Sequence, residues 1–169
     1  LNGAIQVPPN SVDALKGLGI FKDLKKHLTP ISMIRVRDQF LKQDLSSIDV
    51  NNHYFSIARQ ELLLVIKSSF KKNSSLTILE ERIISIEKKG NCYNCITSLG
   101  NVFETKVIIG ADGSEGVCRM QTGTIDQNSN KTFIYRGTLN AEKNNNALFQ
   151  SSVNLWLNDG WHLVYYPYS

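Results

Sequence analysis

Residues 106–113, with the sequence KVIIGADG, constrain the fold more than any other stretch of the chain. Residues 107–109 form a continuous β-branched run, which is typical of a short strand buried on both faces. Gly110 and Gly113 allow the backbone to turn sharply directly after this strand. Asp112 therefore comes at the carboxyl end of the predicted strand, where open α/β sheets bind their ligands. We interpret Asp112 as a candidate site residue, although an Asp-Gly pair is also common in ordinary turns.

The length of 169 residues fits one domain, or one domain with part of a second. The apolar runs are too short to span a bilayer and no signal pattern opens the chain, so we expect a cytoplasmic protein. The net charge of +4 comes from scattered lysine pairs without interleaved aromatics, which favours a solvated surface over a nucleic-acid site. Cys92 and Cys95 fall on opposite faces of a predicted strand, and no second pair completes a zinc site. We expect packing cysteines, Cys118 included, in a reducing compartment, and no metal.

Local patterns predict helices and a meander in the first two thirds of the chain. Ser11 is a good cap for a helix that Gly19 closes, and a second helix is expected from Ser56 or Ile57 to about Lys71. The residues expected on the buried side of this second helix are Leu62, Leu63, Ile66 and Phe70. Strands are predicted at residues 31–37, 39–44, 82–88, 92–98, 102–106, 132–139 and 154–166, with Gly90 and Gly100 in the turns of the meander.

Five segments, in this order, resemble motifs of one enzyme family. They are residues 3–10 (GAIQVPPN), residues 57–62 (IARQEL), residues 110–113 (GADG) with Arg119, residues 133–137 (FIYRG) and residues 162–167 (HLVYYP). Together they are similar to the FAD-dependent aromatic hydroxylases, which are class A flavoprotein monooxygenases. The salicylate-hydroxylase-like branch, related to p-hydroxybenzoate hydroxylase, is the nearest. The resemblance covers essentially the whole chain.

The chain also departs from this family. Ala4 stands near a family glycine, Ala58 replaces a histidine, and Gly116 replaces the serine that follows the Asp-Gly pair. The family's opening G-x-G-x-x-G unit and its later Gly-Asp motif have no counterpart in these residues. The resemblance therefore implies the central part of a flavoenzyme that is truncated at both ends.

The resemblance implies an α/β (mixed α+β) fold in two parts. Residues 1–119 would be a partial FAD-binding, Rossmann-like portion with a β-meander, including some strands of the substrate domain. Residues 120–169 would begin a mainly β substrate-binding portion.

The family motifs imply roles for five cofactor-binding residues. Arg59 would donate hydrogen bonds to the flavin, and Ala4 would lie close to it because it is small. Asp112 and Gly113 would contact the pyrophosphate and ribose of FAD, with a second role in admitting the nicotinamide cofactor. Ile83 would offer backbone groups to the adenine while its side chain packs in the core. The structural alternatives are a solvated Arg59 and a turn aspartate that pairs with Arg119.

Tyr135, Arg136 and Tyr166 are the expected substrate-binding residues, since the resemblance places them on strands that line the substrate pocket. Aromatic residues at alternate strand positions are more often core than ligand contacts. A charged residue within such a strand needs a partner, and a carboxylate on an aromatic substrate would supply one for Arg136.

The resemblance implies an FAD- and NAD(P)H-dependent monooxygenase that hydroxylates a small, salicylate-like aromatic substrate. No catalytic side chain is assigned, because the cofactor carries this chemistry. The alternatives are a folded but inactive remnant of such an enzyme and a non-enzymatic binding module. We expect no nucleic-acid or membrane partner, and self-association through exposed strand edges.

Overall fold

The computed structural model describes residues 3–38, 43–71, 74–123, 133–140 and 151–168. It divides the chain into two compact units, which we call the first unit (Leu1–Leu76 with Tyr135–Ser169) and the second unit (Thr77–Ile134). These bounds differ from the expected division at residues 119 and 120. The reason is that strand β7, late in the sequence, pairs with strand β2 near its beginning, which joins both ends of the chain in one sheet.

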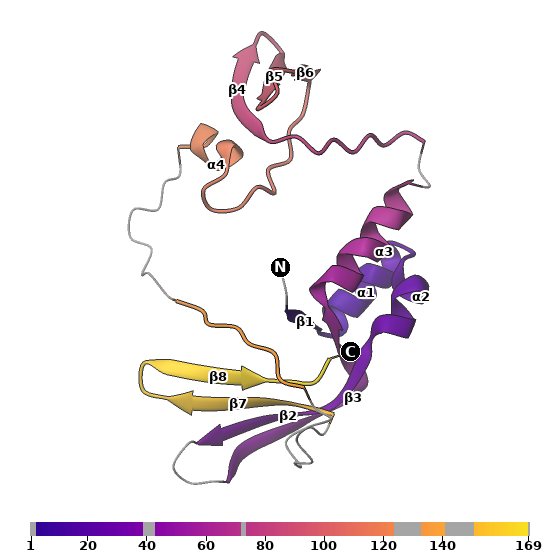
Figure 1. The fold of residues 1–169 in the computed structure, drawn as a ribbon, viewed down its shortest axis with the longest axis vertical. Coiled ribbons are helices and arrows are strands. Elements are labelled where there is room, and N and C mark those ends of the chain that lie inside the picture. Colours follow the sequence, from indigo (N-terminus) through magenta and orange to yellow (C-terminus); the bar gives the residue numbers. More distant parts are fainter. Residues whose placement is uncertain (1–2, 39–42, 72–73, 124–132, 141–150, 169) are drawn as a thin grey trace. The chain divides into compact units, whose positions relative to one another are not determined.

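The first unit is built on a five-stranded sheet in the order β1-β3-β2-β7-β8 (Figure 1). Its strands are β1 (Ala4–Val7), β2 (Thr29–Asp38), β3 (Asp44–Ala58), β7 (Ser152–Asn158) and β8 (Trp161–Tyr165). Only β2 and β7 pair in parallel, and the other neighbours are antiparallel. Because β3 is 15 residues long, its first part pairs with the far end of β2 and its last part pairs with β1.

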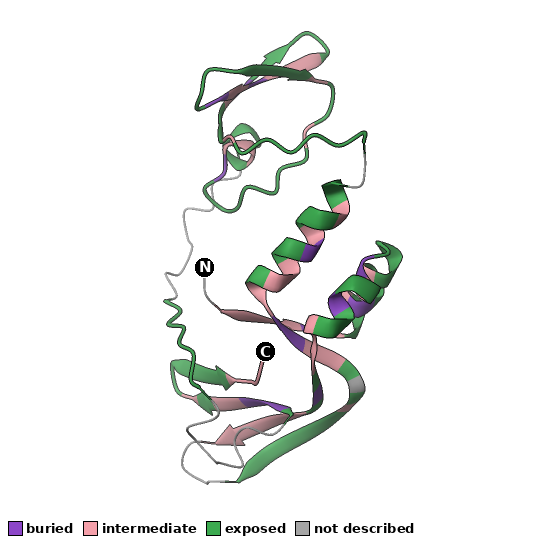
Figure 2. Ribbon diagram, turned by 45° about the vertical axis from the view of Figure 1, so that its right-hand side comes forward, coloured by how far each residue is buried: buried purple, intermediate pink, exposed green. Residues whose placement is uncertain are grey.

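The helices of the first unit cover the end of the sheet where β1 and the last residues of β3 lie. They are α1 (Pro9–Gly17), α2 (Phe21–Leu24), the short 3-10 helix η1 (Lys25–His27) and α3 (Arg59–Lys71). The core between these elements consists of Val7, Val12, Ile20, Leu24, Ile57 and Val65. Figure 2 shows that buried residues concentrate at this junction and along β7. Burying each such aliphatic side chain stabilises the fold by about 1.5–3 kcal/mol, so this core anchors the first unit.

The two long helices form where the sequence predicts them, with differences at their starts. Helix α1 begins at Pro9 after Pro8, not after Ser11, since proline suits the first helical position. Gly19 follows its end with a φ of 73°, as a closing glycine does. Helix α3 starts at Arg59, because β3 continues through Ala58.

The predicted buried side of α3 was only half right. Leu62 and Ile66 pack against the core, but Leu63 and Phe70 are exposed. Val65 is the fully buried residue of this helix. The covered stripe is therefore narrower than the apolar pattern suggests, since α2 is a single short turn and covers only part of the helix.

One predicted strand is wrong, and another lies mostly outside the described residues. The strand that pairs with β2 begins at Asp44, whereas it was expected at residues 39–44, of which 39–42 lie outside the described residues. Residues 133–139 form no strand and are exposed, while residue 132 lies outside the described part. The predicted strand at residues 154–166 is a hairpin, in which Gly160 turns with a φ of 75° between β7 and β8.

The second unit contains the predicted meander. Strands β4 (Ile83–Lys89), β5 (Cys92–Thr97) and β6 (Val102–Thr105) form an antiparallel sheet, followed by the short helix α4 (Val117–Gln121). Gly90 and Gly100 occupy its turns with φ values of 61° and 82°. Ile86, Cys95 and Thr97 are its buried side chains, and Gln121 of α4 donates a hydrogen bond of 2.8 Å to the Ile86 carbonyl. All three cysteines are free, and Cys95 packs in this core as expected.

The buried strand predicted at residues 107–109 does not form. Val107 and Ile109 are 72% and 89% exposed, and no strand is assigned there. A strand needs backbone hydrogen bonds from a neighbouring strand, and the sheet described in the second unit ends at β6. An apolar run alone cannot supply that neighbour.

In the parts of the chain that the structure describes, no helix combines the length and the apolar character needed to cross a membrane.

Candidate functional site

In the first unit, Tyr166 joins the two ends of the sheet. It directly follows β8, and its hydroxyl donates a hydrogen bond of 2.9 Å to the carbonyl of Ala4 at the start of β1. The backbone N–H of Arg59, the first residue of α3, donates a bond of 3.0 Å to the carbonyl of Gly3. These two bonds place Ala4, Arg59 and Tyr166 around the beginning of β1.

Positive charge gathers at the same place. Partial burial raises the pKa of the Tyr166 phenol, and the positive charges of Arg136 and Arg59 partly offset this rise. Glu61, on the first turn of α3, lies 3.0 Å from His27, so its carboxylate is already engaged. None of the salt bridges between described residues involves Arg59 or Arg136. We call Ala4, Arg59, Arg136 and Tyr166 the tyrosine–arginine cluster.

The sequence interpretation missed Gln6, Tyr54 and Ser56, which lie next to this cluster. The Tyr54 hydroxyl donates a hydrogen bond to Oε1 of Gln6, and the Ser56 hydroxyl donates one to the Pro167 carbonyl. Burial and the nearby Tyr166 raise the pKa of Tyr54. The alternate positions of Tyr54, Ser56 and Ala58 could have predicted a strand whose one face carries these side chains. It was overlooked because the second helix was expected to begin at Ser56 or Ile57.

Tyr135 and Arg136 are not on a strand, in contrast to the prediction. Tyr135 is 93% exposed and Arg136 is also exposed. Arg136 is close enough to Tyr166 for its charge to lower the pKa of that phenol. Two residues after each of them, Thr138 and Tyr168 are joined by a hydrogen bond of 3.1 Å. Among the described residues, no hydrogen bond or ion pair joins Tyr135 to the cluster. The substrate roles of both residues remain predictions.

In the second unit, Asp112 holds helix α4. Its carboxylate accepts a hydrogen bond of 3.0 Å from the backbone N–H of Cys118, and this bond is the main reason why its pKa lies below the usual value. Gly116 precedes the helix, and a Cβ there would lie 2.1 Å from Cγ of Asp112. The negative charge of Asp112 in turn contributes, after burial, to a raised pKa of the Cys118 thiol. Asp112 thus has a structural role, because its carboxylate holds the first turn of α4.

Asp112 and Gly113 also line an open pocket of about 880 Å³, which we call the meander pocket. Its walls come from β4, β5, residues 106–113 and α4, all in the second unit. The charged lining residues other than Asp112 are Lys88, Lys106 and Arg119. Ile83 does not line this pocket, and its side chain is 38% exposed, so its expected place in the core was wrong.

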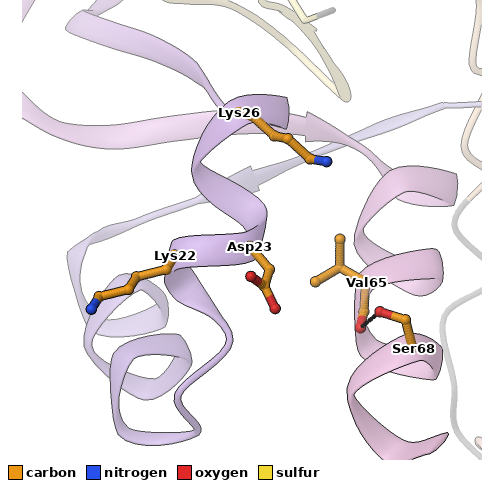
Figure 3. A pocket seen from close by; sticks show the side chains of 5 residues that line it. All are labelled: Lys22, Asp23, Lys26, Val65 and Ser68. Carbon is orange, nitrogen blue, oxygen red and sulfur yellow. Dashed lines mark hydrogen bonds between the residues drawn. The ribbon is translucent and has the colours of Figure 1, made fainter. Parts of the chain in front are cut away.

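A smaller pocket of about 340 Å³ lies between α2 and α3 in the first unit (Figure 3). Lys22, Asp23, Lys26, Val65 and Ser68 line it. The Ser68 hydroxyl donates to the Val65 carbonyl of its own helix, so this polar group is satisfied locally. No residue of this pocket was predicted as a site residue. Among the described residues, no group of three His, Cys, Asp or Glu side chains could hold a metal ion.

The chain is similar in sequence to FAD-dependent monooxygenases. The chain is 23% identical over 124 residues to the FAD-dependent monooxygenase andE of Emericella variicolor. It is 25% identical over 127 residues to janM of Penicillium janthinellum, also an FAD-dependent monooxygenase. These matches cover 70% and 72% of this chain but only 26% of each relative, so the chain spans about a quarter of their length. No family model matches the chain.

The fold is similar to that of solved structures over nearly the full chain. The TM-score is 0.69 against 2,6-dihydroxypyridine-3-hydroxylase of Arthrobacter nicotinovorans, at 18% identity, covering 99% of this chain and 42% of that one. It is 0.68 against Klebsiella pneumoniae HpxO complexed with FAD and uric acid, at 16% identity, covering 100% and 45%. The chain is thus similar to class A FAD-dependent monooxygenases, as a short partial match. It matches a part of the monooxygenase fold, as a mixed α/β segment. Proteins of that family use FAD, the cofactor that the sequence predicts.

Proposed function

We propose that this chain is the central segment of an FAD- and NAD(P)H-dependent monooxygenase that hydroxylates a small aromatic, salicylate-like substrate. The observation that carries the proposal is the tyrosine–arginine cluster, in which four of the predicted site residues meet in one unit. The similarity to FAD-dependent monooxygenases supports the redox chemistry. The substrate and the activity of the whole protein are part of the proposal, since the chain covers about a quarter of its relatives.

The residues of the cluster fit an anionic or strongly polar ligand. Two guanidinium groups act on the same phenol, and Glu61 is paired with His27. Guanidinium groups bind carboxylates and phosphates through paired, charge-assisted hydrogen bonds. Ala4 presents only a methyl group beside them, and its carbonyl accepts the hydrogen bond from Tyr166. The cluster therefore suits both the flavin and a carboxylate-bearing aromatic substrate.

The chain's own residues would bind and orient the reactants. When bound, FAD supplies the redox chemistry and the activation of oxygen. Arg59 would donate hydrogen bonds to the flavin from the start of α3, and Arg136 would hold the substrate carboxylate. Tyr166, fixed by its bond to Ala4, would form a wall beside the aromatic ring. Such positioning contributes to rate because the reacting groups are held in one orientation.

Salicylate and salicyl alcohol provide the test of the substrate class. They share the aromatic ring and the phenol, but only salicylate has a carboxylate. With FAD present, we expect salicylate to bind the chain at least about tenfold more tightly than salicyl alcohol, because a charge-assisted pair is lost with the alcohol. Arg136→Gln should remove this preference. Titration followed by nuclear magnetic resonance measures both affinities.

Arg82→Gln is the matched control, because Arg82 is an exposed arginine of the second unit that is not part of the cluster. It should leave the preference for salicylate unchanged. Equal binding of the two compounds, or a preference that Arg136→Gln does not reduce, would contradict the proposed substrate class.

A second candidate is a folded segment of such an enzyme that does not catalyse by itself. The exposed apolar residues Val107 and Ile109 support it, because a working flavin site normally has its apolar neighbours covered. The same exposed surface supports the proposed self-association of the isolated chain. Under this alternative the chain folds and binds no flavin.

A further inference from the structure

Two of the three cysteines meet at the junction between helix α4 and the meander. Cys95 lies on the central strand β5 and is 5% exposed, whereas Cys118 lies on α4 and is partly exposed. Cys118 also lines the meander pocket, so small molecules from solvent can reach its sulfur. Both thiols are free in this structure. The junction therefore holds one buried thiol and one accessible thiol, and neither belongs to the tyrosine–arginine cluster.

The register of the meander directs Cys95 toward α4. Cys95 is paired with Ile86 of β4, and Tyr93, two residues earlier on β5, is paired with Lys88. Alternate residues of a strand, and residues directly opposite one another on antiparallel strands, share one face of the sheet. Ile86, Lys88 and Tyr93 all line the meander pocket together with residues of α4. The side chain of Cys95 therefore projects from the face of the meander that α4 covers.

Helix α4 presents Cys118 to the same face. Gln121 lies three residues after Cys118, so both side chains are on one side of the helix. Nε2 of Gln121 donates a hydrogen bond of 2.8 Å to the carbonyl of Ile86, the residue opposite Cys95. A Cβ at Gly110 would lie 2.6 Å from Cβ of Cys118, so the segment before the helix leaves the cysteine little room to turn away. The two thiols thus approach each other across one interface.

We propose that Cys95 and Cys118 form a peroxide-reactive dithiol site, which closes to a disulfide between β5 and α4. The accessible sulfur of Cys118 attacks one oxygen of hydrogen peroxide, so an S–O bond forms, the O–O bond breaks, and the departing hydroxide takes the thiol proton and leaves as water. The sulfur of Cys95 then attacks the sulfenic acid of Cys118. The S–S bond forms, the S–O bond breaks, and a second water leaves with the proton of Cys95. Two thiols are thereby oxidised by two electrons, and one peroxide is reduced to two waters.

The charge of Asp112 restrains this reaction. Burial is the main reason why the pKa of the Cys118 thiol lies above its ordinary value, and the charges of Asp112 and Cys95 raise it further. The thiolate is the form that attacks peroxide, so the site reacts slowly. Asp112→Asn keeps an oxygen that can accept the N–H of Cys118 but removes the charge. This variant should close at least about threefold faster, because the thiolate fraction of Cys118 rises.

The disulfide would tether α4 covalently to the meander. In the reduced chain, the helix is held there by the hydrogen bond from Gln121 to the Ile86 carbonyl, and such a bond can open. A bond between residues 95 and 118 closes the intervening chain into a loop and restricts its freedom. Arg119 and Gln121 line the meander pocket, so oxidation would fix one wall of this pocket. A thiol reductant restores the open form by exchange.

Mass spectrometry of the full 169-residue chain, folded and treated with hydrogen peroxide, tests this site. Closure removes two hydrogen atoms, so the mass should fall by about 2 Da, and peptide mapping should place the link between Cys95 and Cys118. Dithiothreitol should restore the original mass. Cys92→Ser is the matched control: Cys92 lies three residues before Cys95 and points to the opposite face of β5, so this variant should close as the unaltered chain does.

Hydrogen exchange of α4 provides a second readout. The amide of Met120 donates to the Gly116 carbonyl within this short helix, and its exchange should slow at least about tenfold on oxidation because the helix is tethered. Cys95→Ser and Cys118→Ser should abolish both the mass loss and the slower exchange.

Other products of the peroxide treatment would overturn the proposal. They are a disulfide that involves Cys92, a disulfide between two chains, and the addition of oxygen to the unaltered chain without a link between Cys95 and Cys118. Unchanged exchange at Met120 in the oxidised chain would contradict the tether. The unaltered chain gives each of these results by itself, so the test does not depend on the folding of a serine variant.

Discussion

Asp112 and Gly116 depend on each other in the turn before α4. The carboxylate of Asp112 occupies the space that a side chain at Gly116 would need, as the 2.1 Å separation between its Cγ and a Cβ built there indicates. Any side chain at position 116 would therefore have to displace the carboxylate or shift the backbone. The contact of Asp112 with the first turn of α4 therefore depends on the glycine at position 116.

Gly116→Ala should detach the Asp112 carboxylate from α4. The added methyl group collides with the carboxylate, and the N–H of Cys118 then loses its acceptor. We expect faster exchange of the Cys118 amide hydrogen with solvent and a smaller α4. Gly17→Ala is the control, since a Cβ at Gly17 meets nothing within 4 Å. Unchanged exchange at Cys118 in Gly116→Ala would contradict the coupling.

Tyr54 and Tyr166 should give the fold a distinctive response to alkaline pH. Burial is the main reason why the pKa of each phenol lies above its ordinary value of 10.0. The folded state therefore holds these protons more strongly than the unfolded state does. Their contribution to stability is complete below pH 10 and is lost as the pH rises from there through the folded-state values.

The double variant Tyr54→Phe/Tyr166→Phe removes both titrations. We expect it to be less stable near neutral pH, by about 1 kcal/mol for each lost hydrogen bond, but to lose stability less steeply above pH 10. Urea unfolding at a series of pH values measures both effects. Parallel stability curves for the variant and the unaltered chain would show that neither phenol is perturbed.

Among the elements, the β2–β3 hairpin carries its own ion-pair network. Oδ2 of Asp44 lies 2.9 Å from Nη1 of Arg35, and its Oδ1 lies 3.1 Å from Nε of Arg37, at an angle too poor for a full hydrogen bond. Arg37 also lies over the ring of Trp156, 5.4 Å from its centre, which connects the hairpin to β7. All three charged side chains are less than one third exposed.

Asp44→Asn should weaken the first unit by about 1–3 kcal/mol, because it leaves two half-buried guanidinium groups without their carboxylate. Asp13→Asn is the control. Asp13 pairs with Lys16 at 3.5 Å on the exposed surface of α1, where such a pair contributes about 0–1 kcal/mol. The free energy of unfolding in urea compares them. Equal losses would mean that the hairpin network stabilises no more than a surface pair does.

Some elements could be predicted from the sequence and others could not. The meander was predicted almost residue by residue, because Gly90 and Gly100 mark its turns locally. The supposed strand at residues 107–109 failed because a strand depends on a partner that its own sequence does not reveal. The parallel pairing of β2 with β7 joins residues more than a hundred positions apart, and no local pattern indicates it.

For the whole molecule, the order of the motifs predicted the similarity to FAD-dependent monooxygenases. Ala4, Arg59 and Tyr166 belong to three different motifs, and the structure brings them together in the first unit. Asp112 and Gly113 line a pocket in the second unit. Lys88 and Tyr93 were missed because lysine pairs were interpreted only as solvated surface. Their place at the pocket follows from the pairing of β4 with β5, which the sequence predicted, and from the packing of α4, which it did not.

The visible absorption spectrum of the purified chain is the most direct test of the central claim, that this segment belongs to a flavin-binding enzyme and contributes to the flavin site. The chain is incubated with FAD, and free flavin is then removed by gel filtration. We predict a yellow protein whose flavin bands elute with the chain and whose flavin content falls in Arg59→Gln. A folded, colourless protein that retains no flavin would contradict the claim for this segment.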